Sequence, residues 1–203
     1  MKHLLVLFMV VLLPLMASAV VTLGEVTISG EKHPVTVMMK KNKPHYYCIP
    51  VPSRKTGTHE IWIKPDKAAK FRTALFEAKA KFKEWKQVAR DNNVGEFEKE
   101  MPVKFPNVTY VWGHGNLFFG DAPFKLMYRR TKEGVDFAVL AMNVKSDTNR
   151  FADENFIFFF YNEDEIETVI EVLSSKNIEK VLLENADYDS TNDRRTVDDS
   201  LFN

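Results

Sequence analysis

Cys48 is the residue of this chain best suited to act as a nucleophile, because it is the single cysteine in the sequence. A cysteine thiolate attacks its substrate efficiently when a nearby histidine has taken its proton. His45 lies three residues away. Residues three apart on a strand point to opposite faces, so a base would come from His59 or His114. One interpretation is a hydrolase-type enzyme with a site assembled from distant loops, and the simpler one is a buried cysteine that packs like a small hydrophobic residue.

The sequence carries none of the short motifs that mark common catalytic or metal sites. It has no G-x-S-x-G, no glycine-rich phosphate loop, no H-E-x-x-H and no paired C-x-x-C. A metal site would need histidines and acids to converge, but the histidines are scattered and lack ligand spacing. We therefore expect no locally encoded catalytic residue, no metal and no cofactor.

The segment 112–124, WGHGNLFFGDAPF, has the composition of a binding surface. It holds three of the eight glycines, which allow sharp bends, and several aromatic residues, which offer contact area with little rotamer entropy. Phe118 and Phe119 are adjacent, so an extended backbone directs them to opposite faces. The alternative is a hairpin whose rings pack into the core. The candidate ligand-binding residues are Trp112, His114, Phe118, Phe119 and Asp121.

The segment 66–94 predicts the longest helix of the chain. Its apolar residues recur at steps of three and four, which places them on one helical stripe. Pro65 precedes the helix, Asp66 suits its first turn, and Gly95 suits its end. We expect Trp85 to be the central anchor, in contact with both halves of the protein. The stripe consists of Ala68, Phe71, Leu75, Ala78, Phe82, Trp85 and Ala89.

Alternating apolar residues bounded by turn residues predict strands on both sides of this helix. Four strands precede it, at residues 22–29, 35–40, 45–51 and 60–64. Four follow, at 108–112, 124–130, 135–144 and 156–161, then a helix at 163–176 capped by Asn162 and a candidate last strand at 178–183. This order predicts an α+β protein with antiparallel sheet and two helices. The halves form either a tandem of two ββββα units or one sheet with both helices on one face.

The segment 156–161, FIFFFY, carries apolar residues on both faces. An edge strand of this kind would pair with other chains and aggregate. We therefore expect it in the centre of a sheet, with a helix over one face and a second layer against the other.

Two successive units of four strands and a helix resemble, in element order, the whirly and PUR-type binders of single-stranded nucleic acid. The resemblance implies a basic helix face and exposed aromatic rings that hold the strand. Basic and acidic residues are balanced, at 28 each, so the net charge does not favour a polyanionic partner. A solvated helix face is the simpler interpretation, and we do not expect nucleic acid as the partner. The basic residues are Lys67, Lys70, Lys79, Lys81, Lys83, Lys86 and Arg90.

Residues 1–19 have the pattern of a secretory signal peptide, with an apolar run at 4–16 and an Ala-Ser-Ala cleavage site. The run is too short to span a bilayer, so we expect an exported protein of the periplasm, the cell surface or the extracellular space, without a membrane span. A single cysteine forms no internal disulfide. The mature chain divides into a sheet-plus-long-helix unit (20–100), a second sheet-plus-helix unit (101–184) and an acidic flexible tail (185–203).

These patterns favour an exported binding or interaction protein without catalytic machinery. Its partner is a protein or a small molecule that the sequence does not identify, and the oligomeric state is open. The alternatives are the hydrolase-type enzyme with Cys48, His59 and His114, and a nucleic-acid binder that uses the basic helix face.

Overall fold

The computed structural model describes residues 20–53 and 55–192. Within them the chain forms ten strands and three helices in two antiparallel sheets, which confirms the predicted α+β class. The predicted signal peptide (1–19) and the end of the predicted tail (193–203) lie outside the described residues. The strands are β1 (Val20–Ile28), β2 (Glu31–Lys40), β3 (Lys43–Pro50), β4 (Thr58–Ile63), β5 (Phe97–Glu100), β6 (Asn107–Gly113), β7 (Phe118–Pro123), β8 (Met127–Arg130), β9 (Asp136–Lys145) and β10 (Asp153–Phe160), and the helices are α1 (Pro65–Asp91), α2 (Glu163–Val172) and α3 (Ser175–Asn192).

One sheet has six strands in the order β1-β2-β3-β4-β6-β7, and the other has four in the order β10-β9-β8-β5. β6 and β7 belong to the segment 101–184, yet β6 pairs with β4 of the first segment. Conversely, β5 lies before residue 101 and pairs with β8. The predicted boundary near residue 100 therefore does not divide the two sheets, because strand pairing joins segments from both sides of it.

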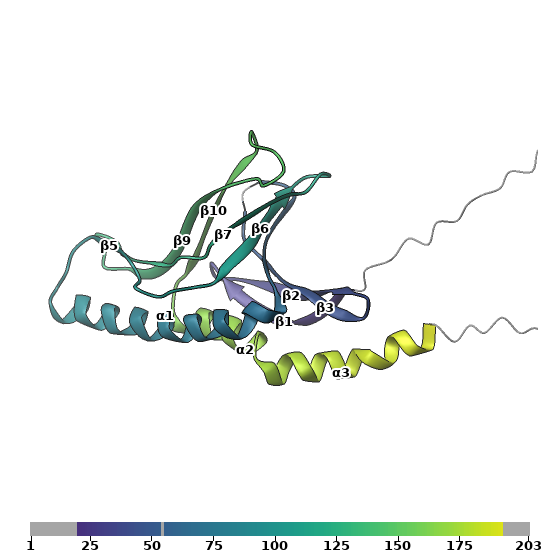
Figure 1. Ribbon diagram of the computed structural model, residues 1–203. Helices are drawn as coiled ribbons and strands as arrows, with labels where there is room; N and C mark the ends of the chain where they lie inside the picture. The colour runs from purple at the N-terminus through teal and green to yellow at the C-terminus, as the bar shows by residue number, and fades with distance from the viewer. Residues whose placement is uncertain (1–19, 54, 193–203) are drawn as a thin grey trace, which may run out of the picture.

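Both sheets lie on the same side of α1 (Figure 1). Backbone hydrogen bonds join the two sheets at two seams. At one seam the Ser29 N–H donates to the Phe159 carbonyl at 2.9 Å, and at the other the Asp147 N–H donates to the Phe119 carbonyl at 2.8 Å. The core lies between the sheets and α1, and a hollow within it beside Leu75 measures about 10 Å³. A cavity must have at least about this volume to hold one water molecule. Side chains therefore pack closely in this part of the interior.

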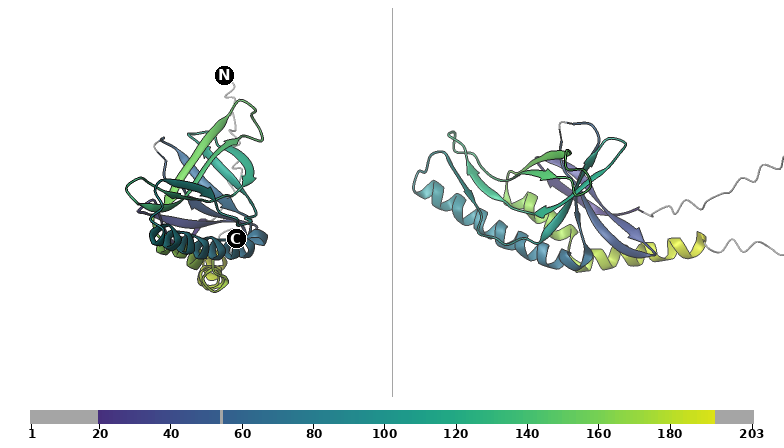
Figure 2. Two further views of the ribbon diagram at one scale, coloured as in Figure 1. Left: turned by 90° about the vertical axis from the view of Figure 1, so that its left-hand side faces the viewer. Right: turned by 45° about the horizontal axis from the view of Figure 1, so that its top comes forward.

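α1 and α2 lie together along one side of the molecule, and both sheets lie on the other side of these helices (Figure 2). Pro65 occupies the first turn of α1, where its missing N–H would have no partner in any case. The residue at the N-cap is Lys64, and Asp66 follows inside the first turn without capping it.

The anchor of α1 is the middle of the predicted stripe. Phe71, Leu75 and Phe82 are fully buried against the core. Trp85 is only partly buried, and its ring packs edge to face on Tyr128 with 5.9 Å between the centroids. The expected central role of Trp85 is therefore wrong, because its ring lies at the margin of the core while the smaller Ala89 one turn later is buried.

β10 is an edge strand of the four-stranded sheet and not the central strand that its composition predicts. Its even-numbered phenylalanines are buried in the core, whereas Ile157 on the other face is 52% exposed. Part of the free edge is covered by a side chain from the β1–β2 turn, since Ser29 Oγ accepts a hydrogen bond from the Phe159 N–H at 3.0 Å. The backbone and the hydroxyl of Ser29 therefore take the place of part of a neighbouring strand.

α2 begins as the sequence predicts, because Asn162 Oδ1 accepts a hydrogen bond from the Glu165 N–H at 3.0 Å. The segment 178–183, expected as a last strand, lies inside α3. α3 packs against β1 near its start, where the Asn177 side chain donates to the Leu23 carbonyl at 3.0 Å. The first residues of the predicted tail, 185–192, continue this helix.

Candidate binding face on the six-stranded sheet

The segment 112–124 forms most of a hairpin made by β6 and β7, with a turn at residues 114–117. Gly113 precedes the turn with φ of +137°, and a Cβ at this position would lie 2.1 Å from the Asn116 carbonyl oxygen. Only glycine fits so close an approach in this backbone conformation. The hairpin divides the five predicted binding residues among its two faces and its turn.

Trp112 and Phe118 face the core. Trp112 is 4% exposed, and its ring lies 6.0 Å from the rings of both Phe118 and Phe156. Phe118 is partly buried against the same core. His114 lies in the exposed turn, away from these rings. For Trp112 and Phe118 the structure thus matches the packing alternative.

Phe119 and Asp121 lie on the outer face of the sheet. Phe119 belongs to a second apolar cluster, separate from the core, whose described members all come from strands of this sheet. Cys48, Trp62 and Val111 are buried in it, while Met38, Tyr46 and Phe119 are partly exposed above them. We call the side chains of Met38, Tyr46, Trp62 and Phe119 the aromatic face.

The rings of the aromatic face form a continuous row across the sheet. The centroids of Tyr46 and Trp62 are 5.1 Å apart, and those of Trp62 and Phe119 are 5.5 Å apart. His45 extends the row beyond Tyr46, with 4.5 Å between the two centroids. Successive rings are tilted by 41° to 68°. The surface is therefore corrugated rather than flat.

Strand register explains why these residues meet. Met38 lies opposite Tyr46, Cys48 opposite Trp62, and Val111 opposite Phe119. Residues directly opposite each other in an antiparallel pair share a face of the sheet. Alternation within the segments 45–51 and 60–64 therefore indicates on which face of its strand each of Tyr46 and Trp62 lies. Only the pairing of four strands places these two residues beside Phe119.

Two carboxylates lie beside the aromatic face, away from Tyr46, and each accepts a hydrogen bond from a side chain of the same sheet. Trp62 Nε1 donates to the Glu60 carboxylate, and Thr109 Oγ1 donates to the Asp121 carboxylate. Asp121 itself is exposed. The face therefore combines an apolar centre with carboxylates along part of its rim, which is the composition of many interaction surfaces.

The structure does not bring together the three residues of the hydrolase-type alternative. Cys48 lies on the outer face of the six-stranded sheet, the buried His59 lies on its inner side, and His114 is in the exposed turn. Burial raises the pKa of the Cys48 thiol to about 12, with the charge of Glu60 acting in the same direction. A thiol in this state is protonated and unreactive at neutral pH.

His59 belongs to a buried polar cluster that the sequence did not reveal. It is 8% exposed, and within the described residues neither of its ring nitrogens has a hydrogen-bond partner. Its Nε2 lies 3.7 Å from Oε2 of Glu154, which is also buried. Lys55 Nζ holds both oxygens of Glu154 at 2.7 Å.

The Glu154 carboxyl is held in its charged form. Burial acts most strongly and raises its pKa, but hydrogen bonds from Lys55 and from the Asn155 N–H outweigh burial, with help from the charges of Lys55 and His59. The net effect lowers the pKa of Glu154 below its usual value. This cluster is an ion pair at the end of the core, beside an imidazole with unused hydrogen-bonding capacity.

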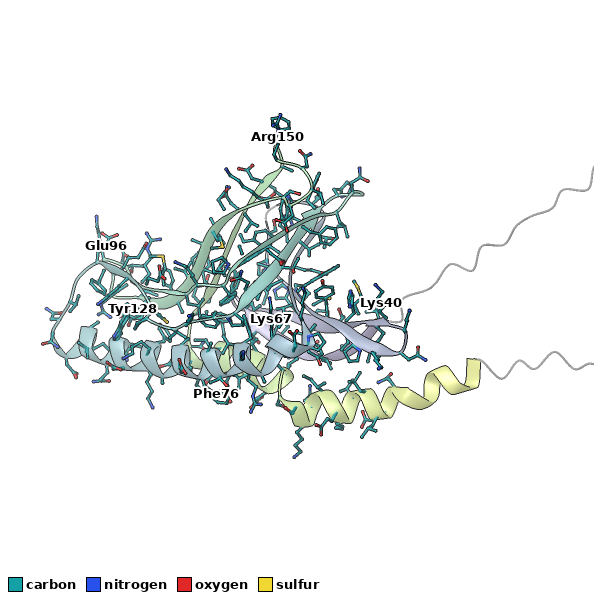
Figure 3. All side chains as sticks on the ribbon, viewed as in Figure 1. Lys40, Lys67, Phe76, Glu96, Tyr128 and Arg150 are labelled. Atoms are coloured by element: carbon teal, nitrogen blue, oxygen red, sulfur yellow. The ribbon has the colours of Figure 1, made fainter. Side chains whose placement is uncertain are left out.

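The basic face predicted for α1 is partly occupied by α2. Lys79 pairs with Glu167 at 2.6 Å, and Lys86 pairs with Glu163 at 2.9 Å. These charges dock one helix on the other. Phe76, on the side of α1 that faces away from the sheets, is 44% exposed (Figure 3).

Comparisons of the chain with protein-family models, with curated proteins and with solved structures found no match. Among residues 20–53 and 55–192, no three histidine, cysteine, aspartate or glutamate side chains gather closely enough to hold a metal ion. None of the described helices combines the length and the apolar composition that crossing a bilayer requires.

Proposed function

We propose that this protein is an exported, non-enzymatic binding protein whose recognition surface is the aromatic face. The observation that carries the proposal is the second apolar cluster, in which Tyr46, Phe119 and Met38 are partly exposed on the outside of a sheet. Contiguous apolar patches of this kind mark interaction sites on soluble proteins. Aromatic and methionine side chains are also enriched in the buried centres of such sites.

The chemistry of the remaining candidates supports binding rather than catalysis. The Cys48 thiol is protonated, because burial raises its pKa to about 12. The described structure separates Cys48 from His59 by the thickness of the sheet. Export is proposed from the composition of residues 1–19.

The proposal is tested with a displayed peptide library that is selected on the wild-type protein. We expect selected binders to lose at least about tenfold in affinity, which is 1.4 kcal/mol, on a Tyr46→Ser/Phe119→Ser double variant. Both side chains are partly exposed, so the double variant should keep its fold by circular dichroism and thermal melting.

Phe76→Ser is the matched control, because Phe76 is an exposed aromatic residue on another surface of the protein. The proposal would be contradicted by binders whose affinity is unchanged on the double variant. Binders whose affinity falls equally on Phe76→Ser would also contradict it. If the double variant unfolds, hydroxyl-radical footprinting of wild type with a selected peptide replaces it. Protection of Tyr46 and Phe119 on binding is then expected, and unchanged labelling of both would count against the aromatic face.

A further inference from the structure

Two lysines lie directly opposite each other at one end of the aromatic face. Lys40 pairs with Lys43 across the β2–β3 hairpin, and Figure 3 shows Lys40 at the free end of this hairpin. Met38 packs on the aromatic face and Met39 on the core, so alternation returns Lys40 to the outer face. Lys43, as its cross-strand partner, shares that face.

A third lysine flanks the same end. Lys64 follows β4 with an extended backbone, at φ −67° and ψ 144°. Ile63 points into the core and lies opposite Tyr47, so the next residue, Lys64, returns to the outer face beside Tyr46. We call Lys40, Lys43 and Lys64 the lysine end of the aromatic face.

Two basic residues on other strand positions have acidic partners. On β2, Lys32 pairs with Glu25 at 3.7 Å, and on β8, Arg129 pairs with Glu98 at 3.3 Å. Within residues 20–53 and 55–192, none of the three lysines of the lysine end forms an ion pair, although all three are exposed. Like charges directly opposite each other destabilise an antiparallel pair. The fold itself therefore gives no reason for this arrangement.

The turn between these strands breaks a second local rule. Lys41 and Asn42 have φ of 50° and 57°, the left-handed conformations of a two-residue hairpin turn. Glycine, asparagine and aspartate favour the first of these positions, whereas lysine has no side chain suited to it. Places where a sequence breaks local rules without a compensating contact are frequently functional.

We propose that the aromatic face binds an acidic segment of a partner protein, with the acids over the lysine end and an apolar side chain against Tyr46 and Phe119. This inference rests on the proposed function. Lysines without an acidic partner among residues 20–53 and 55–192 complement such a segment and steer it to the face.

The rest of the face favours a protein segment over a longer polyanion. The carboxylates of Glu60 and Asp121 lie beyond Trp62, away from the lysine end, and would repel a phosphate chain that continued across the rings. The corrugated rings and Met38 suit the varied side chains of a peptide better than the parallel stacking of bases.

The experiment compares binders from the displayed library by composition, salt dependence and response to charge reversal. We expect binders that depend on Tyr46 and Phe119 to be enriched in aspartate and glutamate. A synthetic peptide from that set should lose at least about tenfold in affinity on Lys40→Glu/Lys43→Glu. Its affinity for wild type should fall as salt rises, because salt screens exposed charges.

Lys70→Glu is the matched control, because Lys70 is an exposed lysine on α1 that forms no ion pair in the described structure. Single Lys40→Glu adds a further check, since it places opposite charges across the hairpin. It should leave the melting temperature unchanged or raise it while it weakens binding, an outcome that a purely structural role would not produce.

Failure of this inference is distinguishable from failure of the proposed function. Binders that need Tyr46 and Phe119 but show no acidic enrichment and tolerate both reversals would overturn the acidic partner and leave the aromatic face in place. A single-stranded oligonucleotide that binds more tightly than the acidic peptides, and depends on the same lysines, would also overturn it. Binders that need none of these residues would overturn both.

Discussion

At the scale of single residues, the ion pair of Glu154 and Lys55 makes the stability of the fold depend on pH. The hydrogen bonds that hold Glu154 charged lower its pKa below 4.5 in the folded protein, whereas the unfolded chain keeps the ordinary value. A lowered folded pKa stabilises the fold above the unfolded pKa. That contribution is lost as the pH falls through the folded value.

We therefore predict that Glu154→Gln lowers the free energy of unfolding at pH 7 and has a shrinking effect below about pH 4.5. Lys55 is 66% exposed, so water screens the pair and the difference at pH 7 should be no more than about 1 kcal/mol. Urea unfolding of both proteins between pH 3 and pH 7 measures it. An equal difference at every pH would show that packing, and not the charge of Glu154, is responsible.

At the scale of elements, β10 shows how an apolar strand is kept at a sheet edge. Residues 155, 157, 159 and 161 turn their backbone groups away from β9, because these groups alternate along a strand. The N–H of Asn155 donates to the Glu154 side chain, that of Phe159 to Ser29 Oγ, and that of Tyr161 to Glu165. These three hydrogen bonds occupy N–H groups of the edge to which another chain could otherwise pair.

Removing one cap should expose this edge. Ser29 has a φ of 55°, so Ser29→Gly removes the hydroxyl without straining the backbone. We predict faster aggregation of this variant, followed by light scattering and thioflavin fluorescence at 37 °C. Adding Ile157→Lys, which places a charge on the exposed face, should restore solubility. Aggregation at the wild-type rate in Ser29→Gly would mean that the Ser29 hydroxyl does not protect β10.

At the scale of the whole molecule, the seams between the sheets decide whether the core is enclosed. Gly120 of β7 lies against β9, where an added Cβ would be 2.3 Å from the Lys145 carbonyl oxygen and 2.6 Å from Val144 Cγ1. Backbone atoms cannot yield as a flexible side chain can. Any side chain at this position would push the two sheets apart.

Gly120→Ala should therefore lower the free energy of unfolding by more than about 2 kcal/mol, since the strain falls on packed backbone. Gly95→Ala is the control, because a Cβ at that position meets nothing within 4 Å. It should change stability by less than about 0.5 kcal/mol. Chemical denaturation of the two variants tests the seam, and similar values for both would show that β7 and β9 can separate without loss of the core.

Several local features could be predicted from the sequence because their causes are local. The period of α1, the cap at Asn162 and the opposite directions of Phe118 and Phe119 each depend on residues within a few positions. The apolar stripe also predicted which face of α1 is buried. The most deeply buried large side chains of the helix lie between Phe71 and Phe82, and Trp85 is not among them.

The tertiary structure alone decided which strands are neighbours. β6 joins β4 across the whole of α1, and this pairing sets Phe119 beside Trp62. The register of β3 and β4 places Cys48 and His59 on opposite faces of the sheet. The packing of one sheet on the other brings Glu154 to Lys55, and the strand order of the four-stranded sheet places β10 at an edge. Alternation fixes the two faces of a strand but carries no information about its partners, because register depends on contacts between residues far apart in the chain. The sequence by itself therefore determined most of the elements and their faces, and the pairing of the strands decided which side chains share a surface.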